Sequence, residues 1–304
     1  MTDATPGFFM MLATHPALFV TCCVLLGLMV GSFLNVVIHR MPIMLDNETR
    51  EHCEEMAHPD APPVKRPTYN LVVPRSACPK CQAPITAVQN IPVVSWLVLR
   101  GKCANCKTPI SARYPLLEAA TGLLTGIVAA HFGVTLLALA GIVFTWLLIA
   151  LTMIDLDTQY LPDDLTYPLL WLGLLMSLTH PVWAPGADPL TPQDSIIGAI
   201  VGYLVLWSFH WLYYLVREQE GMGYGDFKLY AAFGAWFGYK MLLPILLFAS
   251  VVGSIIGIYV MYRQRKGLDT KIPFGPYLAA AGWLFLMVGH QAVERYLGLF
   301  PHSR

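Results

Sequence analysis

Eight apolar stretches constrain this chain of 304 residues more than any other feature. A membrane-spanning helix needs roughly 20 apolar residues, and the second, fourth and sixth stretches are short by that standard. Charged residues make up only 12% of the chain, about half of their share in soluble domains, and the mean hydropathy is +0.56. The sequence therefore predicts an all-α polytopic membrane protein with about eight transmembrane helices. The stretches are 16–38, 116–132, 135–154, 165–179, 195–216, 228–239, 241–262 and 277–293.

Basic residues are distributed unevenly between the two predicted sides of the membrane. If the N-terminus lies outside, all but three of the 19 Lys and Arg residues fall on the inner side, the exceptions being Lys240, Arg295 and Arg304. Basic loops stay in the cytoplasm, so we expect an outside N-terminus. The formal net charge is zero, which suggests no nucleic-acid partner and leaves the lipid bilayer as the expected surroundings.

One long polar insert interrupts the series of apolar stretches. We expect residues 1–38 to form the first transmembrane helix, residues 39–115 a cytoplasmic insert, and residues 116–304 a helical membrane core. Within the core, Gly198 and Gly202 have the spacing of a close contact between helices.

Four cysteines in the insert form two C-x-x-C pairs. Cys78 and Cys81 make the first pair, and Cys103 and Cys106 make the second. Two such pairs fit a tetrahedral zinc site, and a reducing compartment argues against structural disulfides. Four ligands leave no open position on the metal. The sequence therefore predicts a structural zinc site, with redox-active or unpaired thiols as the alternative.

A glycine-rich turn carries the first candidate catalytic acid. In the segment from Gly221 to Asp226, glycines alternate with other residues directly before the acid. Glycine leaves the backbone open to a close approach, so we expect an extended peptide to bind at Gly223 and Gly225. The alternative is a flexible turn in which Asp226 caps the next helix, a position that aspartate favours.

A second acidic segment follows the stretch 135–154 and is expected at the same membrane face. Two neighbouring carboxylates do not both ionise easily, so one can act as an acid and the other as a base. From the residues alone, Asp155 and Asp157 are equal candidates to partner Asp226. Asp164 is a further candidate, whereas Asp163, after a proline, fits a helix cap better.

The sequence lacks the motifs of two other classes of hydrolase. The sequence contains neither H-E-x-x-H, the motif of many metalloproteases, nor G-x-S-x-G, the motif around an activated serine. Neither of these two enzyme classes is therefore indicated. A transporter would also carry membrane acids, but nearer the midplane, and a non-enzymatic scaffold would need no paired acids. Paired acids at the membrane edge favour hydrolysis of a peptide bond by acid–base catalysis.

Several further segments carry a common pattern with the cysteine pairs and the acids. They are residues 31–40, Arg113-Tyr114-Pro115 with Glu118, and residues 154–163, 221–228 and 273–276. Together, over nearly the whole chain, they resemble the bacterial type IV prepilin peptidases, membrane aspartic proteases of the G-x-G-D class. One departure is Thr158, where many members carry histidine.

The resemblance implies both a function and a location. It makes Asp155 and Asp226 the catalytic pair, because the first aspartate of the family precedes the proline of its motif by seven positions, as Asp155 precedes Pro162. It implies an enzyme of the bacterial inner membrane that cleaves the basic leader of prepilins and pseudopilins after a glycine. It further implies methylation of the new N-terminus with S-adenosylmethionine. No strand–glycine loop–helix pattern marks a site for that donor, so its binding residues stay unassigned.

Overall fold

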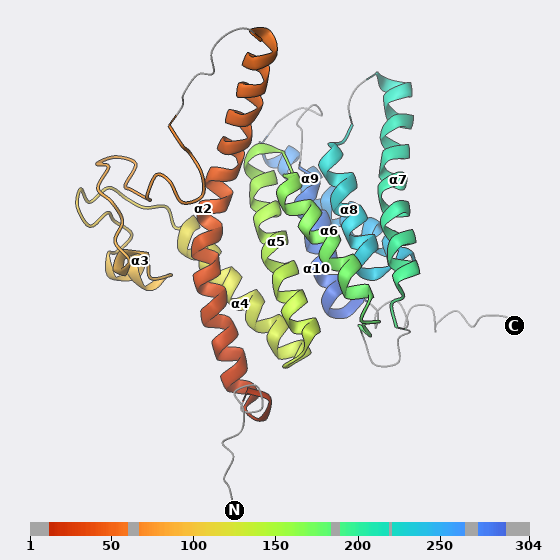
Figure 1. The fold of residues 1–304 in the computed structure, drawn as a ribbon, viewed down its shortest axis with the longest axis horizontal. Helices are drawn as coiled ribbons and strands as arrows, with labels where there is room; N and C mark the ends of the chain where they lie inside the picture. Colours follow the sequence, from red (N-terminus) through yellow and green to blue (C-terminus); the bar gives the residue numbers. More distant parts are fainter. Residues whose placement is uncertain (1–11, 60–66, 184–188, 219–220, 265–272, 290–304) are drawn as a thin grey trace, which may run out of the picture. The chain divides into compact units, whose positions relative to one another are not determined.

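The computed structural model describes residues 12–59, 67–183, 189–218, 221–264 and 273–289 (Figure 1). These residues form helices and turns, and the bridges between Ala77 and Pro84 and between Lys102 and Pro109 are the only extended pairings in these ranges. The chain divides into two compact units, Met1–Ala138 and Leu139–Arg304. The prediction of an all-α protein is confirmed.

Five helices in the described ranges are long and apolar enough to cross a membrane, so the chain is a multi-pass membrane protein. Three other stretches form shorter helices: α6, with 15 residues, α8, with 14, and α10, which ends in the π-helical turn η3. The predicted number of eight spans is therefore not confirmed, and residues 290–293 of the last stretch lie outside the described ranges. The five are α2 (Pro16–Ala57), α4 (Arg113–Phe132), α5 (Leu136–Thr158), α7 (Pro192–Arg217) and α9 (Leu242–Gln264), the last counted from Tyr239 to Arg263. The others are α6 (Asp163–Ser177), α8 (Tyr224–Phe237), α10 (Gly275–Leu284) and η3 (Phe285–Gly289).

In the first unit, α2 packs along α4. A Cβ atom on Gly31 would lie 2.8 Å from the Glu118 Cα atom, so only glycine allows the two backbones to approach this closely. Helix α2 has 42 residues and continues past Pro42 into a charged segment that ends at Ala57. The apolar pattern ends at residue 38, but the polar residues that follow are mostly good helix formers, so the helix extends well beyond the apolar stretch.

Buried charged residues connect the insert to these two helices. Arg40 of α2 donates hydrogen bonds to the carbonyl oxygens of Asn70, at 2.9 Å, and Pro74, at 2.6 Å. Glu118 of α4 accepts a hydrogen bond of 2.7 Å from the backbone N–H of Val93. That bond places the short helix α3 (Val94–Val98) beside the first turns of α4 (Figure 1).

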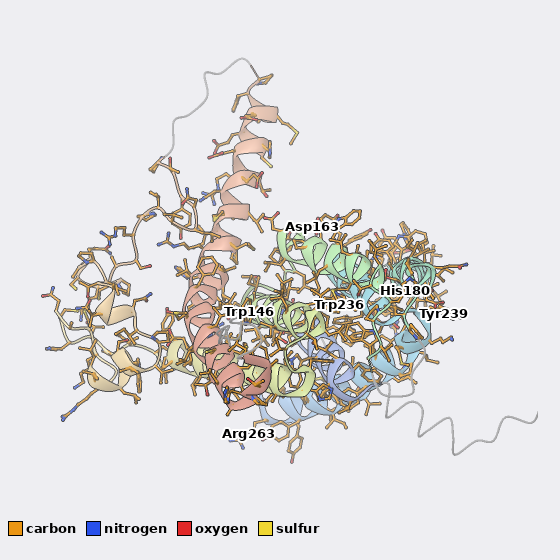
Figure 2. All side chains as sticks on the ribbon, turned by 60° about the horizontal axis from the view of Figure 1, so that its bottom comes forward. Trp146, Asp163, His180, Trp236, Tyr239 and Arg263 are labelled. Atoms are coloured by element: carbon orange, nitrogen blue, oxygen red, sulfur yellow. The ribbon has the colours of Figure 1, made fainter. Side chains whose placement is uncertain are left out.

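In the second unit, α8 packs against both α6 and α7 and is almost wholly enclosed by protein. The Trp236 indole N–H donates to the Leu169 carbonyl at 2.8 Å, and the Tyr230 hydroxyl donates to the Leu242 carbonyl at 2.7 Å. Figure 2 shows Trp236 among the packed side chains of this unit. Protein therefore covers α8 on nearly all sides.

The predicted contact at Gly198 is confirmed. In α7 this residue touches the backbone of Gly234 in α8, and a Cβ atom on either glycine would collide with the other residue's carbonyl oxygen. One turn further along α7, Gly202 faces the carbonyl oxygen of Tyr230 in the same way. The backbones of α7 and α8 are therefore in direct contact.

Candidate active site

Two buried carboxylates meet within the second unit. Asp155 lies in the last turn of α5 with 5% of its surface exposed, and Asp226 is the third residue of α8 with 8% exposed. The two groups are close enough to interact electrostatically. Among the described residues of this unit, no other acidic side chain is buried.

The N-terminus of α8 positions Asp226. Gly223 is the N-cap residue, and its carbonyl oxygen accepts a hydrogen bond of 3.2 Å from the Asp226 backbone N–H. The carboxylate reaches back to the Gly223 backbone N–H, which is half of a capping box. Asp226 is thus the third residue of the helix rather than its N-cap, so the helix start fixes its side chain.

The N-terminus of α10 positions Asp155. The first residue of that helix, Gly275, donates its backbone N–H to the Asp155 carboxylate. Such an N–H has no partner within its own helix, and the helix dipole favours negative charge there. A Cβ atom on Gly275 would lie 2.5 Å from Asp155 Oδ2, so glycine is required for this contact.

The buried side chain of Leu161 lies between the two helix starts. A Cβ atom on Gly225 would come within 2.6 Å of Leu161 Cβ, and one on Gly275 would come within 3.3 Å of Leu161 Cδ1. Because Leu161 follows α5 by only a few residues, the segment after Asp155 packs against the turns that hold both carboxylates. This segment thereby helps to set the distance between the two carboxylates.

Each carboxylate keeps one oxygen without a partner. Within the described ranges, Asp155 Oδ2 and Asp226 Oδ1 are buried and accept no hydrogen bond. A buried polar atom without a partner is costly and calls for an explanation. Two such oxygens on neighbouring carboxylates can bind a water molecule or a polarised carbonyl group.

The competing acids lie elsewhere. Asp157 and Asp164 are exposed. The prediction that Asp163 caps α6 is wrong, because Pro162 is the N-cap residue and no side chain caps the helix. Asp163 instead accepts hydrogen bonds from Lys228 Nζ at both carboxylate oxygens, each at 2.7 Å. The sequence pattern of helix caps could not predict this ion pair, because Lys228 is distant from Asp163 in the sequence.

The two glycines predicted to bind substrate have different surroundings. A Cβ atom on Gly223 would meet nothing nearer than Asp226 Oδ2, at 3.9 Å, whereas Gly225 packs directly against Leu161. Packing alone therefore explains the glycine at 225, and only Gly223 retains open space beside its backbone.

The four cysteines of the insert gather into one cluster that can bind a metal ion such as zinc. Their sulfur atoms all lie within 4.8 Å of one another, with 3.7 Å between Cys78 and Cys106 and 4.0 Å between Cys81 and Cys103. Four sulfurs about 2.3 Å from a tetrahedral zinc ion would lie about 3.8 Å apart. Hydrogen bonding with the side chain and then the backbone of Thr108 lowers the pKa of the Cys106 thiol to about 6, which favours the thiolate that a metal requires.

Sequence reasoning did not predict the positions of Leu161, Gly275 and Lys228. Gly275 belongs to the segment 273–276 and Lys228 to the segment 221–228, both of which carry the resemblance described above. Neither segment shows by itself what its residues touch. Leu161 has no sequence signal beyond its place between the two acids, because a single leucine in an apolar chain is not distinctive.

Comparison with known proteins identifies relatives of both parts of the chain. Residues 25–132 match the family model described as the bacterial peptidase A24 N-terminal domain, and residues 142–258 match the type IV leader peptidase family. No solved structure matches the chain.

Curated relatives cover almost the whole chain. A protein of Stutzerimonas stutzeri and one of Pseudomonas aeruginosa are each 50% identical to it over 286 residues, which cover 94% of this chain and 96% of theirs. A protein of Dichelobacter nodosus is 46% identical over 281 residues, covering 91% of this chain and 94% of its own. All three are named prepilin leader peptidase/N-methyltransferase. The chain therefore belongs to the type IV leader peptidase family.

Proposed function

We propose that this chain removes the short basic leader peptide of type IV prepilins and pseudopilins, cutting after a glycine at the cytoplasmic membrane face. The named activity of relatives at 50% identity supports this proposal. The observation that carries it is the buried pair Asp155 and Asp226, in which each carboxylate has one oxygen without a partner. Such a pair suits acid–base hydrolysis of a peptide bond.

In the proposed mechanism the two carboxyl groups share one proton. The ionised group takes a proton from a water molecule as the water oxygen attacks the scissile carbonyl carbon. The protonated group donates its proton to the carbonyl oxygen, which gives a tetrahedral diol. The other group then passes the proton it took from water to the leaving nitrogen. The C–N bond breaks as one hydroxyl of the diol returns its proton to the first carboxylate, which leaves a carboxylic acid on the leader and a free amine on the pilin. The extended peptide would lie along the open backbone at Gly223.

The same protein would then methylate the new N-terminus. S-adenosylmethionine, when bound, would supply a methyl group to the free amine, which would lose one proton in exchange. The second half of the relatives' name supports this activity. An enzyme that only cleaves is the alternative, and we assign no residue of this chain to the donor.

The remaining parts fit this function. Cys78, Cys81, Cys103 and Cys106 would hold a structural zinc ion, because four thiolates leave no position for a substrate. We propose the division into a first transmembrane helix (1–38), an insert (39–115) and a peptidase core (116–304), in the bacterial inner membrane with the N-terminus outside. The distribution of basic residues supports this orientation.

One experiment tests the peptidase and methyltransferase proposals together. Purified protein in detergent is mixed with a leader-bearing prepilin and S-adenosylmethionine, and the masses of the products are measured by mass spectrometry. We expect a free leader and a pilin that carries one added methyl group. A cleaved pilin without the methyl group would support the peptidase activity and contradict the methyltransferase activity. An intact prepilin would contradict the proposal and favour a transporter that uses the same acids.

A further inference from the structure

The insert exposes apolar side chains next to basic ones. Among the described residues, Val88, Ile91, Val94, Leu97 and Val98 are all exposed, the last two by 61% and 75%. Monomeric soluble surfaces rarely leave such residues together without a partner. We call these five residues the apolar patch; they belong to η1 (Val88–Asn90), to α3 and to the turn between them.

The depth of this patch follows from one hydrogen bond. Helix α4 has 20 residues, so at about 1.5 Å per residue it is about 30 Å long, just enough to cross the hydrocarbon core. Glu118 lies in the second turn of α4 and binds the backbone of Val93, directly before α3. Helix α3 therefore begins at the depth of the second turn of α4, near the boundary of a membrane that α4 crosses.

The charge of the surrounding chain has a single sign. No Asp or Glu occurs between residues 61 and 117, whereas eight Lys or Arg residues do. Arg100 and Lys102 closely follow α3, Lys107 follows the second cysteine pair, and all three are exposed. A basic surface of this kind attracts anionic lipid headgroups.

The apolar and basic residues are held together as one rigid surface. The Trp96 indole N–H donates to the Ile110 carbonyl at 3.1 Å, and Ile110 donates to the Gly101 carbonyl at 2.7 Å. The Trp96 ring also packs over Gly101, where a Cβ atom would lie 2.8 Å from it. Helix α3 is thus fixed to the segment that carries Arg100, Lys102 and the second cysteine pair.

We propose that the apolar patch and the adjacent Arg100, Lys102 and Lys107 form a docking surface for the bilayer itself, with the apolar side chains among the upper acyl chains and the cations on anionic phosphates. An interfacial segment with apolar residues on one side and cations on the other binds in this way. The surface would hold the insert against the membrane from which prepilins are presented. This role goes beyond both proposed reactions and depends on neither.

Photocrosslinking tests the proposal in the full-length protein. The residue p-benzoylphenylalanine replaces Leu97 or Val98, and in a control Met56, which is 76% exposed near the far end of α2. Met56 lies 16 residues beyond Arg40, about 24 Å further along the helix axis. Each protein is reconstituted into nanodiscs of phosphatidylcholine, with or without phosphatidylglycerol, and irradiated, and lipid adducts are measured by intact-protein mass spectrometry.

We expect lipid adducts from positions 97 and 98, several-fold above those from position 56, and more of them when phosphatidylglycerol is present. Combining Arg100→Gln, Lys102→Gln and Lys107→Gln should remove the increase caused by phosphatidylglycerol. Adduct yields at 97 and 98 no higher than at 56 would overturn the proposal. Adducts to a second copy of the chain in place of lipid would overturn it too. An unchanged phosphatidylglycerol effect in the triple variant would overturn the role of the cations.

Discussion

Lys228 and Asp163 form a salt bridge in which Lys228 Nζ lies 2.7 Å from each carboxylate oxygen. This salt bridge connects the two segments that carry the buried acids. Lys228 lies two residues after Asp226, and Asp163 begins the helix that follows Leu161. Figure 2 shows Asp163 at the start of α6. The pair is partly exposed, so its contribution to stability is modest, whereas its position suits it to fix the geometry of the site.

Breaking this ion pair should lower the rate of cleavage clearly, while the unfolding temperature changes little. For Lys228→Met or Asp163→Asn we expect kcat to fall roughly tenfold, since a loss of about 1.4 kcal/mol of transition-state stabilisation has that effect, with KM nearly unchanged. Exchanging the charges, as Lys228→Asp with Asp163→Lys, should restore part of the loss. Steady-state kinetics on a prepilin peptide measures both constants, and thermal unfolding serves as the control. Normal kcat in both single variants would refute the positioning role.

Removing either buried acid should abolish cleavage without unfolding the protein. Asp155→Asn and Asp226→Asn keep the side-chain shape but remove a group that transfers a proton, a contribution on the order of a hundred- to ten-thousandfold. Asp157→Asn is the matched control, because that residue lies two positions away and is exposed. Leader release is measured by gel or mass spectrometry. If Asp157→Asn were the inactive variant, our first catalytic position would be wrong by two residues.

The two glycines before Asp226 should respond differently to alanine. Gly223→Ala has room for the methyl group, so we expect a stable protein whose KM for prepilin rises because the methyl group crowds the open backbone. Gly225→Ala would push against Leu161, so we expect a lower unfolding temperature. Unfolding curves and KM values distinguish the two effects. Unchanged KM in Gly223→Ala would end the assignment of that glycine to substrate binding.

The cysteine cluster should contain about one zinc ion per chain, as expected for four thiolates in a tetrahedral arrangement. Replacing any one of Cys78, Cys81, Cys103 and Cys106 by serine should lower zinc content and loosen the insert, with a smaller effect on cleavage. Elemental analysis and protease sensitivity of residues 67–112 measure the two effects. A wild-type protein without zinc, in which all four thiols titrate freely, would contradict the prediction.

Cleavage and methylation should be separable. Hydrolysis needs the pair of acids, whereas methyl transfer needs mainly the orientation of the amine toward the donor. Asp226→Asn should therefore still transfer labelled methyl groups to a pre-cleaved pilin with a free N-terminal Phe, and wild type serves as the control. If only wild type labels the pilin and the variant is intact, the two reactions share one site.

Some features of the fold could be predicted because they depend on composition and local spacing. Apart from the end of α2, the apolar stretches located the helices within a few residues, and the two C-x-x-C pairs indicated the sulfur cluster that the structure contains. The end of α2 could not be predicted in this way, because a hydropathy pattern shows where a chain leaves the membrane, not where its helix ends.

Other features depend on contacts between residues distant in sequence. Helix α8 has the composition of a transmembrane helix, and no sequence pattern shows that α6 and α7 cover it. Asp163 follows a proline, as a helix cap often does, and only the fold brings it to Lys228. From the residues alone, Asp155 and Asp157 were equal candidates to partner Asp226, and the fold shows that Asp155 is buried whereas Asp157 is exposed. The places of Leu161 and Gly275 beside the two buried acids could not be predicted.

The contact between Gly198 and Gly234 restricts how a substrate can arrive. Under the proposed function, a prepilin embedded in the bilayer would have to pass between helices to present its backbone. At Gly198 and Gly202 it could not pass between α7 and α8, because the two main chains touch there and leave no width for a third.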